Sequence, residues 1–464
     1  MFEIFCTNKC FYLYDAIVNV IIEISEKDYN LLDRYLLGNQ EHDVLYCLER
    51  FQEKGICKRE KIECIEHSMT DVLPYYIDQN ISNMILQVTQ QCNLRCSYCV
   101  YSGNYVGRTH SGITMNFETA TKAVDFYMQH NNNSESPTLG FYGGEPLLQI
   151  DLIKRIIEYT ESKYPKRQLN YMMTVNGTLL DEKISDYLAE KKFTLLISLD
   201  GPKQIHDVDR KTIDGKGSFE TIYRNLRYIR NNYPDFYKTI MTNTVIKPSD
   251  DYTELLEFFE NDSLISDLNS RSSTVFDSEL KENMQYDYSK FDEIIWTNRK
   301  NMLDNMIDGG KRKNYRLIDD YLFEMKKYCK ILMSGSPYLL KNHPGGPCIP
   351  VARRLFVDAL GNFYPCEKIA EIEDARIGSV QEGFDVEKIK KMINVGKTTA
   401  NECSTCWAFQ FCSSCIVRSF GKNGLDKNIR LSYCNKNKKF AKAVLRDICY
   451  LRENGVDIQE IIQK

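Results

Sequence analysis

Residues 91–99 read Gln-Cys-Asn-Leu-Arg-Cys-Ser-Tyr-Cys, and this short stretch decides the fold class of the 464-residue chain. Cys92, Cys96 and Cys99 place three thiolates on one loop, enough to hold three irons of a cubane cluster. The fourth iron then has no protein ligand nearby, and an open metal position keeps a site available for a substrate or cofactor. The structural alternative is a zinc loop that borrows its fourth ligand from elsewhere in the chain.

A second motif follows one expected strand and one expected helix later. The apolar run within residues 138–148 ends in Gly143, Gly144, Glu145 and Pro146. Glycines let a backbone approach a ligand closely, and a glutamate accepts hydrogen bonds from an ammonium group. Such a segment is more often only a turn, so its place after the three cysteines is what makes it informative.

Together, the Cys92–Cys99 motif and the Gly-Gly-Glu-Pro segment resemble the radical S-adenosylmethionine (SAM) enzymes. The resemblance implies that the three cysteines bind a 4Fe-4S cluster and that Gly143, Gly144 and Glu145 contact the amino group of SAM. It also implies cleavage of SAM to a 5′-deoxyadenosyl radical that abstracts hydrogen from a substrate, so that the cofactor supplies the difficult chemistry. Tyr98 takes the place of an aromatic residue near the adenine; packing in the core is the alternative for this tyrosine.

Two expected strand ends supply further polar candidates. Asn176 ends one apolar run, Ser198 and Asp200 end the next, and Arg210 follows in the loop. The resemblance implies that these side chains contact the ribose and carboxylate of SAM. Ordinary turn chemistry explains them equally well, because Asn and Asp tolerate special backbone angles.

The middle of the chain alternates apolar strands with amphipathic helices, which is typical of a β/α barrel. An amphipathic helix is expected over 117–128, and strands are expected over 84–90, 138–143, 169–176, 193–200 and 240–246, with a weaker sixth strand near Thr274–Phe276. The resemblance implies an α/β fold, a partial (βα)6 TIM-like radical SAM barrel whose cofactor lies at the C-terminal ends of the strands.

The C-terminal third carries a second set of cysteines. Two single cysteines precede a CxxCx5CxxC pattern and a last cysteine, and the full set is Cys348, Cys366, Cys403, Cys406, Cys412, Cys415 and Cys434. Two zinc ribbons suit this spacing as well. Together with the first motif, however, the set resembles the SPASM extension of radical SAM enzymes, which holds two auxiliary 4Fe-4S clusters, three clusters in all.

The resemblance assigns these cysteines to an outer and an inner cluster. The outer ligands are Cys403, Cys406, Cys412 and Cys434, and the inner ligands are Cys348, Cys366 and Cys415. The inner cluster is one ligand short, with Cys329 and His343 as the upstream candidates. An open inner iron would bind a substrate thiolate, which suits an enzyme that forms thioethers.

Three further side chains are weaker candidates. Glu367 directly follows Cys366, where sulfatase-maturating relatives place an aspartate that acts as a base, although a surface carboxylate is the simpler interpretation. Arg108 and His110 lie in the loop after the first motif, and we expect that loop to be solvated.

The first 75 residues show strand formers over 11–25 and helical spacing over 26–36 and 41–54. A strand followed by helices resembles the winged-helix-like element that holds the leader of a precursor peptide by adding a strand to its sheet. A structural cap on the barrel is the alternative. The expected organisation is therefore a recognition domain, a barrel, a bridging region and a SPASM domain, over residues 1–75, 80–300, 301–340 and 341–464.

Composition limits the location and the partners of the chain. The net charge is −4 with acids and bases interspersed, so no nucleic-acid partner is expected. No segment reaches the roughly 18 to 20 apolar residues of a membrane span, and the first residues lack the pattern of a secretory signal. Seventeen cysteines without such a signal favour thiolate ligation in a reducing compartment, so we expect a cytoplasmic protein.

The resemblance over residues 80–450 implies a maturase of the ranthipeptide or sactipeptide type, which forms a thioether crosslink in a ribosomally made, Cys-containing peptide. Its expected partners are that precursor peptide with its leader and an electron donor such as flavodoxin or ferredoxin. Two alternatives remain open. One is oxidation of a Cys or Ser in a protein substrate, as in anaerobic sulfatase maturation, and the other is a zinc-based peptide-binding protein without catalysis.

Overall fold

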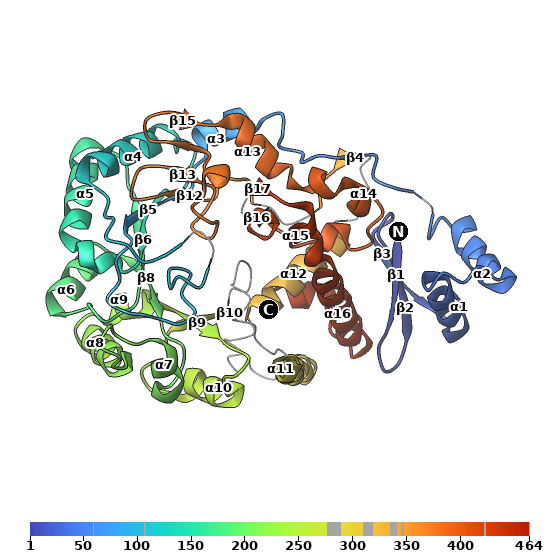
Figure 1. Cartoon of the computed structure of the whole chain (residues 1–464). Helices are drawn as coiled ribbons and strands as arrows, with labels where there is room; N and C mark the ends of the chain where they lie inside the picture. Colours follow the sequence, from blue (N-terminus) through green and yellow to red (C-terminus); the bar gives the residue numbers. More distant parts are fainter. Residues whose placement is uncertain are drawn as a thin grey trace.

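The structure is a computed structural model, and it describes residues 1–58, 60–105, 108–275, 289–309, 319–334, 341–344, 348–421 and 424–463 (Figure 1). A small N-terminal sheet with two helices lies at one end of the molecule, beside the long helix α16 (Cys434–Glu453). A large sheet with its flanking helices lies at the other end, and the C-terminal third lies between them.

The central sheet is mostly parallel and has the order β10-β9-β8-β7-β6-β5-β12-β13. Its six sequential parallel strands are β5 (Asn83–Thr89), β6 (Thr138–Gly143), β7 (Asn170–Val175), β8 (Thr194–Ser198), β9 (Met241–Ile246) and β10 (Asn269–Thr274). Strands that follow the chain in this order result from repeated crossover connections of the same hand. The α/β class with a mostly parallel sheet is therefore confirmed.

The first five strand predictions are confirmed to within two residues, but the sixth is displaced. β10 ends at Thr274, whereas the prediction began there, and Phe276 lies outside the described residues. The sequence of β10, Asn-Ser-Arg-Ser-Ser-Thr, contains no apolar residue. It is the edge strand of the sheet and pairs with β9, so it needs little apolar surface and gives no hydrophobic signal.

Helices follow the strands and cover the outer face of the sheet in an arc (Figure 1). The principal ones are α4 (Phe117–Gln129), α5 (Ile150–Lys163), α6 (Glu182–Glu190), α8 (Phe219–Asn232) and α10 (Tyr252–Asn261), with the shorter α3 (Leu73–Gln79), α7 (Lys203–Asp209) and α9 (Pro234–Thr239). α4 confirms the predicted helix. Asn116 caps its N-terminus by accepting the Thr119 N–H, and its buried face includes Val124 and Tyr127.

The C-terminal third extends the same sheet. β12 (Leu355–Val357) pairs in parallel with β5, and β13 (Phe363–Tyr364) pairs antiparallel with β12. Cys366 follows β13 by two residues, while the Cys92–Cys99 loop follows β5. The same sheet thus carries both cysteine-bearing regions, but at different ends: the Cys92–Cys99 loop leaves the C-terminal end of β5, whereas the antiparallel β13 leads Cys366 back toward the start of β5.

The other elements of the C-terminal third are short apart from three helices. The helices α11 (Ser289–Ile307) and α12 (Asp319–Met333) pack against α16, and α12 also contacts α17 (Ile458–Gln463). The short elements are β11 (Lys341–Asn342), β14 (Gly378–Ser379), β15 (Gly383–Phe384), α13 (Val386–Ile393), α14 (Ala400–Cys403), β16 (Phe420–Gly421), β17 (Gly424–Leu425) and α15 (Lys427–Ser432). β11 pairs with β4 (Cys64–Ile65), from the N-terminal part of the chain.

The N-terminal unit is an antiparallel sheet of β1 (Phe2–Cys6), β2 (Phe11–Asp15) and β3 (Val20–Ile24), followed by α1 (Glu26–Leu36) and α2 (His42–Glu53). Both helix predictions are confirmed. β1 contacts α16, so this unit is anchored to that long helix. Among the described residues, no helix combines the length and the apolar character that crossing a bilayer requires.

Candidate active site at the C-terminal edge of the sheet

The Gly-Gly-Glu-Pro segment is bound to the backbone that leads into the first cysteine loop. Gly144 N–H donates to Thr89 O at 2.9 Å, and Glu145 N–H donates to Gln91 O at 2.8 Å. A Cβ at Gly143 would collide with Thr89 O, and one at Gly144 would collide with Gln91 O. We expected the glycines to admit a ligand; in the structure the close approach that requires them is to the protein's own backbone, which holds the cysteine loop in place.

Glu145 is completely buried and accepts hydrogen bonds from the backbone that follows two strands, β6 and β7. Its carboxylate accepts the N–H of Leu147 at 3.0 Å and the N–H of Asn176 at 2.7 Å. Burial raises the pKa of Glu145 to about 7, against the opposing effect of these two hydrogen bonds. Each oxygen keeps a second lone pair, so the side chain still has capacity to accept a hydrogen bond from an ammonium group.

Asn176 links the end of β7 to the cysteine loop. Its Nδ2 donates to Asn93 Oδ1 at 2.8 Å and lies 3.9 Å from Cys92 Sγ. Its Oδ1 accepts the Thr178 N–H at 2.9 Å, so the amide orientation is fixed. Backbone N–H groups also point at the sulfurs: Leu94 donates to Cys92 Sγ at 3.4 Å. Hydrogen bonds of this kind stabilise thiolates that bind a metal cluster.

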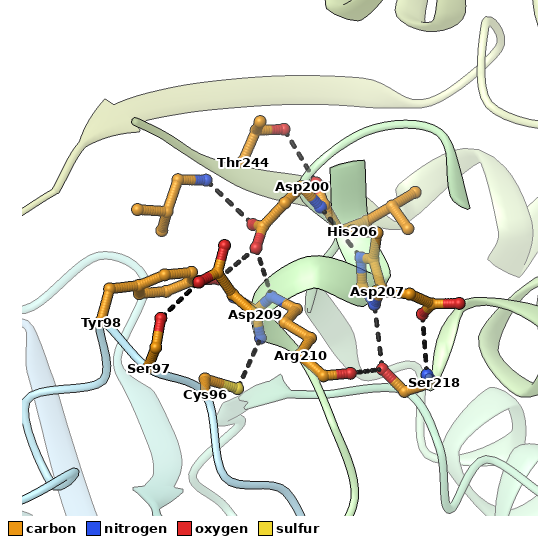
Figure 2. A network of polar contacts seen from close by, with 12 residues as sticks. Cys96, Ser97, Tyr98, Asp200, His206, Asp207, Asp209, Arg210, Ser218 and Thr244 are labelled. Carbon is orange, nitrogen blue, oxygen red and sulfur yellow. Dashed lines mark hydrogen bonds and ion pairs between the residues drawn. The ribbon is translucent and has the colours of Figure 1, made fainter. Parts of the chain in front are cut away.

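Tyr98, Asp200 and Arg210 form a buried network beside the cysteine loop (Figure 2). Asp200 Oδ2 accepts hydrogen bonds from Tyr98 Oη and, at 2.7 Å, from Arg210 Nε. The Arg210 guanidinium lies 5.4 Å from the centre of the Tyr98 ring, and its Nη1 lies 3.9 Å from Cys96 Sγ. Ser198 ends β8 in register with Asn243 and is not among the described residues that this network joins.

A buried histidine that the sequence analysis did not single out supports this network through the backbone of Asp200 (Figure 2). His206 Nδ1 accepts the Asp200 N–H at 3.2 Å, and its Nε2–H donates to Ser218 Oγ at 3.0 Å. Ser218 Oγ in turn donates to Arg210 O at 2.7 Å. Burial lowers the pKa of His206 to about 4, with a further contribution from the Arg210 charge, so the imidazole is neutral and its tautomer is fixed.

A second buried ion pair, between Asp209 and Lys247, holds the same cysteine loop. The Ser97 hydroxyl donates to the carboxylate of Asp209, and the other oxygen of Asp209 pairs with Lys247. Lys247 also lies 3.6 Å from Asp250. The cysteine loop is therefore tied to the end of α7 and to the residue after β9 by charged groups with little exposure to solvent.

Arg108, in the loop after the first motif, is buried, so the expectation that it is solvated is wrong. Arg108 is only 6% exposed, and its Nε lies 3.7 Å from Glu371 Oε1. The same oxygen accepts hydrogen bonds from Tyr101 Oη at 2.8 Å and Gln87 Nε2 at 2.9 Å. Arg108 Nη2 donates to Glu367 O at 3.1 Å and also to Ile369 O.

His110 is half-buried beside that loop, with its Nδ1 3.4 Å from Gln90 O. Burial lowers the pKa of His110. Neither His110 nor Arg108 is a freely solvated side chain, and the Glu371 network is what joins the first cysteine loop to the segment around Cys366. The sequence did not single out Glu371, because its partners lie more than 260 positions upstream.

Glu367 lies at the junction of the two regions. Its Oε1 pairs with Arg354, while its Oε2 is buried without a hydrogen-bond partner among the described residues. Burial raises the pKa of Tyr142 at the end of β6, and the charges of both Glu367 and Cys99 add to that rise. Tyr142 is therefore within electrostatic range of the first cysteine loop and of Glu367, so these groups border one region.

Of the three cysteines expected at the inner cluster, only Cys366 and Cys415 lie within electrostatic range of each other. Burial and then the Glu367 charge raise the pKa of Cys366 to about 11, and Cys415 also contributes. Cys348 is exposed, with Arg353 Nη1 3.7 Å from its Sγ, and lines a separate cavity of about 390 Å³.

Neither proposed fourth ligand for the inner group is available in this conformation. His343 uses both ring nitrogens in backbone hydrogen bonds, to Pro344 O and from Gly396 N–H, each at 2.8 Å. Cys329 is fully buried in the hydrophobic core that includes Met325 and Tyr328. Within the described parts of the chain, the inner group therefore remains one ligand short.

The four expected outer cysteines line one cavity of about 230 Å³, whose members are Cys403, Cys406, Cys412 and Cys434. Among the described residues, no three His, Cys, Asp or Glu side chains are grouped so as to hold a single metal ion. These four thiols line the space in which a cubane cluster would be held.

Comparison with known proteins defines the class of the central unit. Residues 86–260 match the Radical SAM superfamily. This segment begins in β5 and ends in α10, and it includes the Cys92–Cys99 loop, Glu145 and the Asp200–Arg210 pair. The chain therefore carries a radical SAM domain. Such a domain implies one 4Fe-4S cluster and SAM, and the three thiols of the loop fit that group.

Relatives of the whole chain include an anaerobic sulfatase-maturating enzyme. The chain is 26% identical over 399 residues to the cysteine-type enzyme of Clostridium novyi (strain NT), an alignment that covers 80% of this chain and 97% of that protein. It is 31% identical over 189 residues to an uncharacterized protein of Methanocaldococcus jannaschii, which covers 40% of this chain and 63%, less than two thirds, of that relative. The chain is thus homologous to anaerobic sulfatase-maturating enzymes.

Solved structures show the same fold. The structure described as native anSMEcpe with bound AdoMet superposes with a TM-score of 0.60 at 22% identity, covering 80% of this chain and 99% of that one. The same protein with bound AdoMet and Kp18Cys peptide gives a TM-score of 0.59 over the same shares, again at 22% identity.

Proposed function

We propose that this protein is a radical SAM maturase with two auxiliary clusters, and that it forms a thioether crosslink in a ribosomally made, Cys-containing precursor peptide. The observation that carries the proposal is the hydrogen-bond network between the two cysteine-bearing regions. Tyr101 Oη, two residues after Cys99, donates to Glu371 Oε1 at 2.8 Å, and Arg108 Nη2 donates to the backbone oxygen of Glu367, the neighbour of Cys366, at 3.1 Å. A substrate beside this network would contact both regions.

The residues of the radical SAM domain hold and orient the cofactor. When bound, the cluster and SAM supply a radical that removes hydrogen from a carbon of the substrate. Cys92, Cys96 and Cys99 are the proposed cluster ligands. Glu145 is placed to accept from the amino group of SAM, and Arg210, held by Asp200, presents its cation beside the same loop.

The incomplete inner group favours thioether formation. Cys366 and Cys415 lie within electrostatic range of each other, whereas Cys348 is exposed and the upstream candidates are otherwise engaged. A cluster held there keeps an open position, which a substrate thiolate can occupy. Glu367 Oε2, buried and without a partner among the described residues, is placed to take the proton of that thiol.

The N-terminal unit is the proposed site for the leader of the peptide. Of the two edges of its sheet, β1 contacts α16, whereas β3 pairs only with β2 among the described strands. A cavity of about 390 Å³ lies along β3 and α2, lined by apolar side chains such as Ile22, Phe51 and Ile56, and by the cations of Arg50 and Lys54. An extended peptide that adds a strand to β3 would place alternate side chains in this cavity.

The binding of a peptide by a protein of the same fold supports this class of substrate, since a structure of anSMEcpe is described with bound AdoMet and Kp18Cys peptide. The electron donor is proposed to be a small redox protein such as flavodoxin or ferredoxin. The cysteine content and the cluster assignment support a reducing compartment, so we also propose a cytoplasmic location.

The test is mass spectrometry of a candidate peptide, from a short Cys-rich reading frame beside the gene, after anaerobic co-expression. A crosslink removes two hydrogen atoms, retains the sulfur and blocks alkylation of the cysteine. The Cys96→Ala variant serves as the matched control and must leave the peptide unchanged. A peptide that keeps its mass and its free thiol with the active wild-type enzyme contradicts the proposal.

Oxidation of a Cys or Ser in a protein substrate is the second candidate, favoured by the alignment with the Clostridium novyi enzyme over 97% of that protein. The same spectrum separates the two reactions. Oxidation at the Cβ of a cysteine followed by hydrolysis leaves an aldehyde and loses the sulfur, whereas a thioether keeps it. A product that lacks sulfur would favour this second function.

A further inference from the structure

A buried arginine without a carboxylate partner lies beside the outer four-cysteine group. Arg430, on α15, is 2% exposed and is among the largest fully buried side chains of the described structure. No ion pair joins it to any described acidic side chain. Burying a guanidinium in this way is unfavourable unless a negative charge lies close by.

The hydrogen bonds of Arg430 are all to neutral groups. Nη1 donates to Ser414 O and to Ser419 Oγ, both at 3.1 Å, and Nε donates to Thr399 Oγ1 at 3.2 Å. Nη2 is buried without a partner among the described residues. The side chain is therefore fixed in place, while both N–H groups of Nη2 have no partner among the described residues and no described carboxylate compensates the charge.

Thr399 connects this cation to the thiols. Its Oγ1 lies 3.3 Å from Cys403 Sγ. Because Oγ1 already accepts a hydrogen bond from Arg430, its own hydrogen is left to donate, and two acceptors lie within reach: Cys403 Sγ and, at 3.4 Å, Gly396 O. A thiolate can only accept, so a charged sulfur is the stronger acceptor of the two.

The other charged groups at the site differ in exposure. Lys438, on α16, lines the cavity but is exposed to solvent. Glu402 also lines it and is paired with Lys427. Arg430 is thus the buried cation of this group, and its field is the least screened by water.

We infer that Arg430 is the counter-cation of an anionic metal centre at the outer four-cysteine group, and that together with Thr399 it raises the reduction potential of that centre. The inference rests on the proposed 4Fe-4S cluster at this group. Reduction adds one negative charge to a centre that four thiolates already make anionic, and a fixed buried cation favours the more negative state. Arg430 acts through this field, so it is a positioning residue.

The experiment is a redox titration of the anaerobically reconstituted holoenzyme, followed by electron paramagnetic resonance. The outer signal is the one lost in Cys412→Ala. Arg430→Met removes the charge, Arg430→Lys keeps it, and Lys438→Met removes an exposed cation at the same cavity. For Arg430→Met we expect the ratio of reduced to oxidised outer cluster at a fixed potential to fall at least tenfold, about 59 mV for a one-electron couple. The other two variants should change it less than threefold.

The outcomes separate this inference from the proposed function. An outer signal with the same potential in Arg430→Met overturns the role of Arg430 and leaves the cluster assignment intact. Absence of an outer iron signal in the wild type overturns the cluster assignment itself. If Arg430→Met does not bind iron, Thr399→Val is measured instead, because it removes only the hydroxyl. We expect the ratio of reduced to oxidised outer cluster to fall about threefold in this variant. An unchanged reduction potential overturns the proposed effect of Arg430 through Thr399 on Cys403.

Discussion

Breaking the buried pair of Asp200 and Arg210 is expected to destabilise the apo protein strongly. The carboxylate and guanidinium lie 2.7 Å apart, with side chains only 5% and 8% exposed. Two unit charges about 4 Å apart interact by about 4 kcal/mol at the effective dielectric of 20 that suits protein sites. Removing one partner leaves the other charge buried and unpaired, which costs about 3–5 kcal/mol.

The matching assay is a double-mutant cycle with Asp200→Asn, Arg210→Met and both changes, measured by anaerobic urea denaturation of the apo protein. We expect each single variant to lose about 3 kcal/mol, and the double variant to lose about 2 kcal/mol less than the sum. Glu220→Gln is the control, because the Lys203–Glu220 pair has a similar distance of 2.9 Å but side chains 54% and 70% exposed. Its loss should stay below about 0.5 kcal/mol. Additive single losses would refute the reasoning.

Three further predictions concern the same edge of the sheet. Gly144→Ala should lower the iron content by about four atoms per chain, one cubane, because its Cβ would collide with Gln91 O. Gly112→Ala is the control and should leave the iron content unchanged, because its Cβ would meet no atom closer than 3.9 Å. Glu145 has a pKa raised to about 7, so its contribution to apo stability is present at low pH and falls by about 3 kcal/mol as the pH rises from 4.5 to 7. Glu145→Gln should lose that pH dependence in urea titrations, and parallel profiles would contradict it. Glu371→Gln should slow peptide modification at unchanged SAM affinity, measured by product mass and by equilibrium binding, because Glu371 joins the cysteine loop to the second region.

Apolar runs made the barrel strands predictable, and their absence explains what was missed. β5 to β9 carry buried apolar residues that the sequence displays directly. β10 contains none, and β12 is only three residues long, so its pairing with β5 has no local signature. The joining of the C-terminal third to the central sheet was therefore not predicted.

Cysteine spacing and the Gly-Gly-Glu-Pro segment predicted a candidate site, but not the groups that support it. Glu145 and Asp200 were singled out because they follow motifs or strands. His206 and Glu371 act through partners brought near by folding, and such contacts leave no pattern in the sequence. Arg430 lies in Lys-Asn-Ile-Arg-Leu-Ser, which resembles a surface helix, and only the structure shows that it is buried.

The measurement that tests the account most directly is the content of iron, sulfide and zinc per chain after purification without oxygen and reconstitution. The wild type is compared with a variant in which Cys92, Cys96 and Cys99 are all replaced by alanine. Three cubanes predict about twelve irons in the wild type and about eight in the variant. Stoichiometric zinc with little iron would contradict the radical mechanism and support a zinc-based peptide-binding protein.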